Sequence, residues 1–281
     1  MKPRSGIVII AALIVGVLLC VHVQSGNPVT RYVVACIGSS ILYLWFARRV
    51  LTAEVSPKTL VAIIVASLLL RLSFVAMSPI GSDDVYRYIW DGRVQAHGIN
   101  PYRFAPNAEE LRALHSETLP AKVNHPDMKS VYFPVAQWLF LAGYHLSGER
   151  VWGYKLLLFV AEALTLIGLF FLTRSEKRPS HMILLYALCP LPIVSFSIDA
   201  HLDGFGIPFL VFALVCYLRG RFLFSLLLFG LSISVKPVAV ILLPILSFRE
   251  KGFVRKGATL TLPAIILLAG VLPYTGDGHV L

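Results

Sequence analysis

The sequence predicts an all-α polytopic membrane protein, a bundle of about nine transmembrane helices with a large extracytoplasmic loop that carries interfacial helices. Hydrophobic residues make up 57% of the chain and charged residues only 14%. The mean hydropathy is +0.76, far outside the range of soluble globular domains. Several apolar runs reach the roughly 20 residues that a helix needs to cross a bilayer. These values exclude an ordinary soluble domain.

The expected spans follow the apolar runs in chain order. The N-terminus has a basic start and an apolar stretch, as a signal peptide would, but no small-residue cleavage site follows, so we expect a retained first helix. The segment 132–147 is apolar but short, and we expect it to lie on the outer membrane surface or dip into it. The expected spans are residues 6–23, 31–47, 59–77, 152–173, 181–198, 203–218, 222–235, 237–248 and 258–274.

Basic residues between these spans set the orientation through the positive-inside rule. A cytoplasmic N-terminus places the other basic loops in the cytoplasm as well and leaves residues 78–151 outside. The net charge of +10 therefore indicates membrane topology rather than a nucleic-acid-binding surface, so we expect no nucleic-acid partner. The basic clusters are Lys2 with Arg4, and residues 48–58, 174–178, 219–221 and 249–256.

Two adjacent carboxylates, Asp83 and Asp84, open the polar stretch "GSDDVYRYIWDGRVQAHGINPYRF" directly after the third span. Such a pair costs several kcal/mol to desolvate unless it is paired or liganded. One interpretation is a helix cap. The other is function, because a carboxylate beside a membrane can take a proton from an acceptor hydroxyl or hold a divalent cation. Arg87 follows one turn later; it either pairs with Asp84 or Asp91 as a structural contact or has a functional role of its own.

Three further motifs fall on the same outer face. In "NHPDMKSVYFPVAQ", His125 is either a ligand or a structural hydrogen-bonding group, and Tyr132 leads into the interfacial helix. In "SIDAHLDGFG", the residues Asp199, His201 and Asp203 form either a polar turn or a site for a sugar hydroxyl, a metal or a phosphate.

The third motif is "SVKP", at the outer turn of a short apolar hairpin. Its Lys236 lies at membrane depth, where it either binds a phosphate or extends to the surface. Glu162, inside the fourth span near Lys155, is expected to be a structural partner between helices. The four cysteines lie inside predicted spans without a CxxC pair, so we expect them to act as small hydrophobic side chains.

Together, "SDDVYRYIWDGRVQAHGINPY", "NHPDMKSVYFPVAQ", "HLDG" and "SVKP" resemble the bacterial GT-C superfamily of integral-membrane glycosyltransferases. The similarity is greatest to polyprenol-phosphate-mannose-type α-mannosyltransferases and covers roughly residues 58–273. It implies a GT-C-like bundle in the bacterial inner membrane. It also implies a polyprenyl-phosphate sugar donor and a lipid or glycan acceptor on the extracytoplasmic side.

By this resemblance, an aspartate of the acidic motif deprotonates the acceptor in a one-step inverting transfer. That role falls on Asp84 or Asp83, and we favour Asp84; the same pair would hold a divalent cation if one is used. By the same resemblance, Lys236 and the arginines of the loop face the donor phosphate, and His201 and Asp203 line the sugar pocket. The implied substrate-binding residues are Arg87, Arg93, His125, Tyr132, Asp199, His201, Asp203 and Lys236.

The expected organisation is two N-terminal transmembrane helices in residues 1–57, followed by a GT-C-like core in residues 58–281 that includes the extracytoplasmic loop 78–151. Members of the superfamily continue past the point where this sequence reads "LPYTGDGHVL", so a core truncated at its C-terminus is an alternative. Two other function classes stay open: a transporter or flippase of lipid-linked sugars, and a non-catalytic envelope scaffold. No internal repeat of the kind common in transporters is found.

Overall fold

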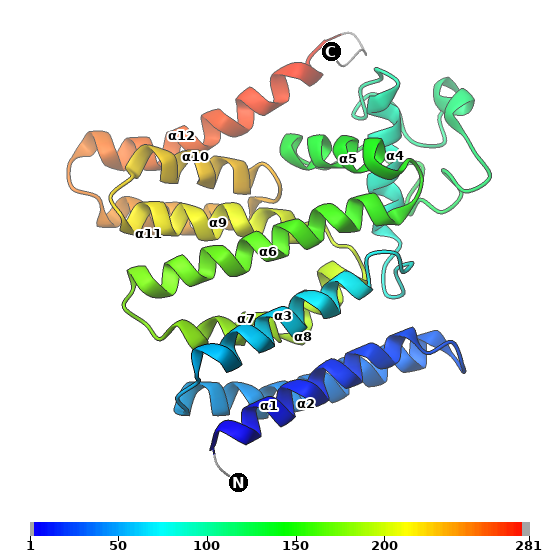
Figure 1. Cartoon of the computed structure of the whole chain (residues 1–281). Helices are drawn as coiled ribbons and strands as arrows, with labels where there is room; N and C mark the ends of the chain where they lie inside the picture. The colour runs from blue at the N-terminus through cyan, green and yellow to red at the C-terminus, as the bar shows by residue number, and fades with distance from the viewer. Residues whose placement is uncertain (1–2, 277–281) are drawn as a thin grey trace.

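The computed structural model describes residues 3–276 as an all-helical protein whose long helices run side by side (Figure 1). The expectations that rest on Lys2 and on the end of the chain at 277–281 fall outside the described residues. The helical class that the sequence predicts is confirmed.

The first two long helices lie side by side at the lower edge of Figure 1, and the third lies above them beside α7 (Leu184–Ala187) and α8 (Pro190–Pro192); all three contribute to one apolar core cluster. Asn27 caps α2, its Oδ1 accepting from the backbone N–H of Val29 at 2.8 Å. Ser56 caps α3 in the same way. Both helices have proline in the first turn, where the missing N–H costs nothing. These elements are α1 (Pro3–Leu19), η1 (Cys20–His22), α2 (Pro28–Thr52) and α3 (Pro57–Ser73).

The polar stretch after the third span forms a short helix, α4, which crosses the direction of the long helices (Figure 1). It packs closely against α5, the helix expected between residues 132 and 147. Gly92 permits this approach, because a Cβ there would lie 2.8 Å from the backbone carbon of Phe140. The elements are α4 (Asp84–Ala96), η2 (Glu109–Leu114) and α5 (Pro134–Ser147).

The expected span 181–198 is broken. Its two halves bend by 47° relative to each other, and the second half begins at Pro190. Proline cannot continue the hydrogen-bond ladder and disfavours helical geometry in the residue before it. A single continuous helix was therefore the wrong expectation here. The elements are α6 (Val151–Ser175), η3 (Ser180–Ile183), α7 (Leu184–Ala187), α8 (Pro190–Pro192) and the π-helical η4 (Ile193–Ile198).

The last helices stack beside α6. The apolar hairpin is present, and its turn lies between Ile233 and Pro237, as the sequence predicts. Ser232 fastens the hairpin to α9 through a 2.9 Å hydrogen bond from its Oγ to the carbonyl of Gly206. The elements are α9 (Asp203–Leu218), α10 (Phe222–Ile233), η5 (Pro237–Ile241), α11 (Leu242–Arg249), α12 (Phe253–Val271) and η6 (Leu272–Tyr274).

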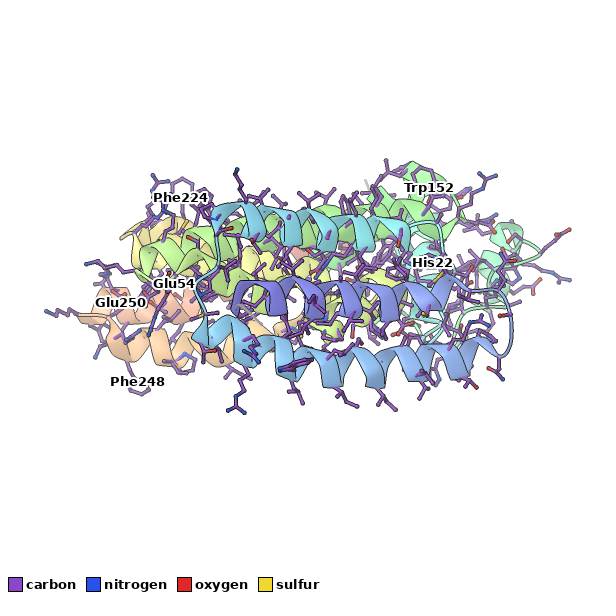
Figure 2. All side chains as sticks on the ribbon, turned by 60° about the horizontal axis from the view of Figure 1, so that its bottom comes forward. His22, Glu54, Trp152, Phe224, Phe248 and Glu250 are labelled. Carbon is purple, nitrogen blue, oxygen red and sulfur yellow. The ribbon has the colours of Figure 1, made fainter. Side chains whose placement is uncertain are left out.

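Within residues 3–276, three helical segments are long and apolar enough to cross a membrane: α2, α6 and Phe253–Tyr274. The bent pair Ser180–Ala187 and Pro190–Ile198 would be a fourth span if it crosses as one unit. Large apolar side chains face outward along these helices. Glu54 and Glu250 lie at one end of the bundle and His22 and Trp152 toward the other (Figure 2). The chain is thus a multi-pass membrane protein.

Charged side chains inside the bundle are matched. Arg71 of α3 and Glu162 of α6, both fully buried, pair at 3.1 Å between Nε and Oε2. Arg71 also donates to the carbonyl of Ala187 at 2.7 Å, and Tyr186 donates to Glu162 at 2.5 Å. Glu162 is therefore the structural partner between helices that the sequence predicts, and its ionic partner is Arg71.

Candidate functional site

Four chain segments that are distant in sequence meet at one end of the bundle: the start of α4, residues 124–132, the junction of η4 and α9, and the turn after α10. Two cavities lie there, of about 230 Å³ and about 240 Å³. Asp84, Val131 and Tyr132 line both of them. We call these the arginine cavity, which Arg87 lines, and the lysine cavity, which Lys236 lines.

Asp84 is the charged side chain that lines both cavities. Asn124 Nδ2 donates to its Oδ1 at 2.6 Å, and His201 Nδ1 lies 3.3 Å from its Oδ2. The hydrogen bond with His201 holds the pKa of Asp84 below its ordinary value of 3.8, against the opposing effect of partial burial. The same contact raises the pKa of His201 above 6.5. Asp84 is therefore ionised at neutral pH.

Local structure explains why Asp84 lies there. It is the first residue of α4, where the helix dipole favours a negative charge. Its N–H is capped by Ser82 Oγ at 3.2 Å. Just upstream, the N–H of Gly81 donates to Asp199 Oδ1 at 2.7 Å, which fixes the approach of the chain. Glycine is required at 81, because a Cβ would lie 2.6 Å from Asp199 Oδ2.

The arginine cavity carries positive charge. Arg87, His125 and Lys129 line it together with Asp84 and Asn124. Arg87 is buried and uses its Nε for Asp91 Oδ1, 3.0 Å away. This resolves the two pairings that the sequence left open in favour of Asp91.

Asp91 itself belongs to a buried network that fixes α4 on α5. Ser130 Oγ and Gln137 Nε2 donate to its Oδ2 at 2.6 and 3.0 Å. Gln137 in turn accepts from Gln95 Nε2 at 2.7 Å, and Tyr274 donates to Gln95 Oε1 at 2.9 Å. Burial raises the pKa of Asp91, and Arg87 and the hydrogen bonds oppose that effect. Satisfied networks of this kind hold a helix in a single orientation.

The lysine cavity is mixed in character. Lys236 Nζ lies 2.7 Å from both oxygens of Asp203, the first residue of α9. His201 completes the polar side, and Tyr88, Phe133 and Pro237 are among the residues of the apolar side. Burial raises the pKa of Tyr132, between the cavities, to about 12, so its hydroxyl stays protonated and can donate to a ligand oxygen.

Three candidates from the sequence lie away from both cavities. Asp83 is exposed and lines neither one. Asp199 is 3% exposed and accepts from Tyr32, Ile80 and Gly81, so it anchors the loop that leads to Asp84. Arg93 lies on another side of α4 and pairs with Glu149. The other candidates, Asp84, Arg87, His125, Tyr132, His201, Asp203 and Lys236, all line one or both cavities.

Sequence reasoning missed Asn124, Tyr88 and Lys129 as cavity residues. Tyr88 was accessible to it, because residues four apart share one face of a helix and Asp84 precedes Tyr88 by four. Asn124 lies in an irregular segment with no periodicity, so no sequence signal places it beside Asp84.

The donor set for a protein-bound cation is incomplete. Within residues 3–276, no group of three or more His, Cys, Asp or Glu side chains could hold a metal ion. Both oxygens of Asp84 already contact protein groups, and Asp83 does not share its cavities. The side chains present therefore do not fit a cation held by Asp83 and Asp84.

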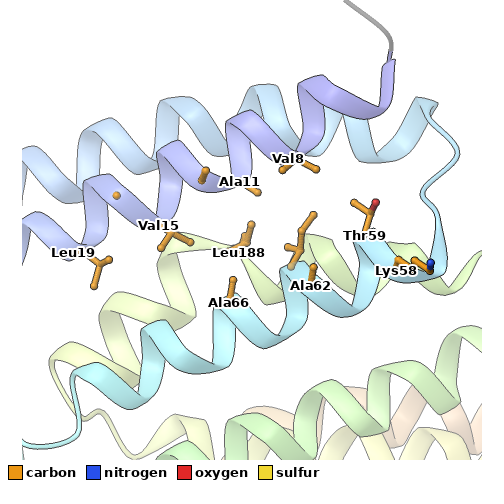
Figure 3. Close-up of a pocket in the computed structure, with 12 residues that line it drawn as sticks. Val8, Ala11, Val15, Leu19, Lys58, Thr59, Ala62, Ala66 and Leu188 are labelled. Atoms are coloured by element: carbon orange, nitrogen blue, oxygen red, sulfur yellow. The ribbon is translucent and has the colours of Figure 1, made fainter.

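A separate apolar hollow of about 640 Å³ lies between α1 and α3 (Figure 3). Its lining includes Val15, Ala62 and Leu188, with Lys58 as its charged residue. It shares no residue with the two polar cavities and offers no acid, base or paired charge.

The chain matches a family model described as alpha-(1->6)-mannopyranosyltransferase, N-terminal domain, over residues 6–249. No curated protein and no solved structure matches it. The match covers the three N-terminal helices, α4, α5 and both polar cavities. The chain therefore belongs to the MptA/B family of alpha-(1->6)-mannopyranosyltransferases, membrane enzymes that transfer mannose from a polyprenyl-phosphate-mannose donor.

Proposed function

We propose that Asp84 is the general base of this mannosyl transfer and that the two cavities receive the two substrates. The observation that carries the proposal is the position of one ionised carboxylate at the junction of two separate cavities. A base must reach the acceptor hydroxyl while that oxygen faces the donor carbon. A group that lines both spaces meets this requirement.

The reaction is a single displacement with inversion. Asp84 takes the proton of the acceptor hydroxyl while its oxygen attacks C1 of the mannose. The bond between C1 and the phosphate oxygen breaks, and polyprenyl phosphate leaves with the bonding electron pair. Cationic side chains stabilise the charge that develops on the phosphate.

The donor is assigned to the lysine cavity. Its apolar side, with Phe133 and Pro237, suits a ligand that arrives from the membrane, and Lys236 supplies a point charge for phosphate. Lys236 Nζ is bound to Asp203, and Asp203 and His201 are placed to accept from or donate to sugar hydroxyls. The acceptor is assigned to the arginine cavity, where His125 and Lys129 are exposed to solvent.

The membrane arrangement completes the proposal. The N-terminus is cytoplasmic, the cavities open on the extracytoplasmic side of the bacterial inner membrane, and residues 78–151 form the outer loop. About nine segments cross or enter the bilayer, since the shorter apolar helices add to the long ones. Residues 1–57 precede a GT-C-like core in residues 58–281.

Reconstitution into vesicles tests the function. With polyprenyl-phosphate [¹⁴C]mannose and an α-(1→6)-linked mannooligosaccharide, the chain should produce labelled oligosaccharide and free polyprenyl phosphate in equal amounts. Movement of intact donor across the bilayer without cleavage would indicate a flippase. If neither product forms nor donor moves while the helical content is native, the scaffold alternative gains and the enzymatic proposal fails for this chain.

A further inference from the structure

A third cavity lies on another side of the first turn of α4. It has a volume of about 290 Å³ and shares no lining residue with the arginine or lysine cavities. Tyr86 brings it within two residues of Asp84 along the helix. We call it the tryptophan cavity, and it is lined by Ala76, Ser78, Tyr86, Thr118, Lys122, Glu149, Arg150, Val151 and Trp152.

The tryptophan cavity combines aromatic surfaces with fixed hydrogen-bonding groups. Tyr86 and Trp152 are half-buried, so part of each ring is available. Lys122 Nζ lies 5.0 Å from the centroid of the Tyr86 ring. Trp152 lies toward the end of the bundle away from Glu54 and Glu250 (Figure 2).

Glu149 is held rigidly in this cavity. Thr118 Oγ1 and Ser116 Oγ donate to its Oε2 at 2.6 and 2.9 Å, and Arg93 pairs with its Oε1. Partial burial opposes ionisation, but these hydrogen bonds and the charge of Arg93 hold the pKa of Glu149 below its ordinary value. A fixed carboxylate beside Arg150 and Lys122 can accept from one hydroxyl while the cations donate to others.

This pairing of groups matches the chemistry of a sugar. The C–H bonds of a pyranose ring pack on the negative face of an aromatic ring, and its hydroxyls both donate and accept hydrogen bonds. The cavity therefore offers a fixed carboxylate acceptor beside the cationic donors Lys122 and Arg150, which suits a hydroxylated ligand; binding of an anionic lipid headgroup is the alternative that the experiment below separates.

The chain also connects this cavity to the site. Lys122 lines the tryptophan cavity, whereas Asn124 binds Asp84, and two residues of chain span at most about 7 Å. The tryptophan cavity is therefore near Asp84 along the chain, and the inference below requires that a glycan with its reacting end at Asp84 extends from one to the other. None of the residues that line this cavity is among the candidate site residues from the sequence, but Arg93, which is one of those candidates, pairs with Glu149.

We infer that the tryptophan cavity is a second acceptor subsite, which binds mannose units of the glycan chain behind the reacting end. The inference rests on the proposed function for the identity of the acceptor. It assigns Trp152 and Tyr86 as stacking surfaces and Glu149, Lys122 and Arg150 as hydroxyl partners. Arg93 positions Glu149.

Binding to the full chain in phosphatidylcholine nanodiscs tests the inference. The probes are an α-(1→6)-linked mannotetraose and methyl α-mannoside, and their binding is measured by saturation-transfer NMR. Trp152→Ala should weaken tetraose binding about tenfold, the factor that corresponds to about 1.4 kcal/mol. Trp152→Phe should retain most of the affinity. Trp138→Ala, at an exposed tryptophan of α5, is the matched control and should leave the affinity unchanged.

Two results would overturn the inference. One is equal tetraose affinity in the wild type, Trp152→Ala and Glu149→Gln. The other compares nanodisc lipids. If the wild type loses tetraose binding when phosphatidylglycerol replaces phosphatidylcholine, and Trp152→Ala restores that binding, the cavity binds a lipid headgroup instead. Asp84→Asn separates this question from catalysis: it should slow transfer by about 10²-fold or more and keep the Trp152-dependent part of tetraose binding. Trp152-dependent binding by a chain with no transferase activity would support the subsite and refute the proposed function.

Discussion

At Asp84, two neighbouring side chains determine the protonation state of the carboxylate. Asn124 donates to one oxygen, and His201 lies 3.3 Å from the other. Because the pKa of Asp84 is lowered, its contribution to stability is present above 3.8 and is lost as the pH falls through the lowered value. Because the pKa of His201 is raised, its contribution is present below 6.5 and is lost as the pH rises through the raised value. The pair therefore stabilises the site most between pH 3.8 and 6.5.

Replacing His201 should change the pH dependence of transfer. In His201→Ala, Asp84 loses the contact that lowers its pKa, so the acidic limb of the kcat/KM profile should move to higher pH. His97→Ala, at an exposed histidine at the end of α4, is the matched control and should leave the limb in place. An unchanged acidic limb in His201→Ala would show that Asp84 is not the group being titrated.

At the residue scale, the sequence pointed to most of the charged residues that line the cavities but not to the side chains that they contact. Asp84, His201 and Lys236, which the sequence marks because charged groups at membrane depth are costly, all line the cavities, whereas the neighbouring Asp83 does not. Arg93 was assigned with Arg87, although the helix turns them to different sides and Glu149 holds Arg93. Partners that lie 56 residues away, as Glu149 does, have no signal in local spacing.

At the scale of elements, one buried lysine joins the two segments that carry the polar residues. Lys155 of α6 is 2% exposed and donates to the carbonyls of Met77 and Ile198 at 2.8 and 3.0 Å. Along the chain, Asp84 comes after Met77, and His201 comes a few residues after Ile198. Lys155 thus ties the two segments together, and we expect it to act as a positioning residue for Asp84 and His201.

Lys155→Met should slow transfer without unfolding the protein. Small displacements of reacting groups cost up to about 10²-fold in rate, so we expect kcat to fall by about 10- to 100-fold with little change in the KM for donor. Lys155→Arg, which keeps donors for both carbonyls, should recover part of the loss. Lys58→Met, at an exposed lysine of α3, is the control. If Lys155 is purely structural, both Lys155 variants should lose thermal stability, and their losses of kcat should follow that loss.

Elements were predictable wherever apolar periodicity and caps agreed. The helix at 134–147, the hairpin turn before Pro237 and the helix after Asp83 were all expected from the sequence. The bend at Pro190 was missed because the apolar run 181–198 has the length of a span, and hydropathy alone does not register a break. The irregular segment 97–133 has no periodicity, and tertiary contacts decide its path.

For the whole molecule, orientation connects the fold to function. The fully buried Arg71–Glu162 pair is neutral as a unit, so it does not affect the charge balance of the loops. In the orientation that we propose from the positive-inside rule, the loops near Arg49 and Lys251 are cytoplasmic and the cavities lie outside. The family model matches residues 6–249, which extend well beyond the polar stretch.

Cysteine accessibility tests this orientation. In a cysteine-free background, Glu117→Cys in the outer loop should react with a membrane-impermeant maleimide in intact cells. Lys251→Cys should react only after permeabilisation. Both residues are exposed in the structure, so burial does not protect either one. The reverse labelling pattern would place the cavities on the cytoplasmic side and contradict the orientation.

The central claim is that Asp84, rather than its neighbour Asp83, takes the acceptor proton. The most direct measurement is the single-turnover rate of mannose transfer by Asp84→Asn and Asp83→Asn in the same vesicles. Asp84→Asn should lose about 10²-fold or more, the typical contribution of a general base, whereas Asp83→Asn should stay near the wild-type rate. Wild-type transfer by Asp84→Asn, or an equal loss in Asp83→Asn, would contradict the account.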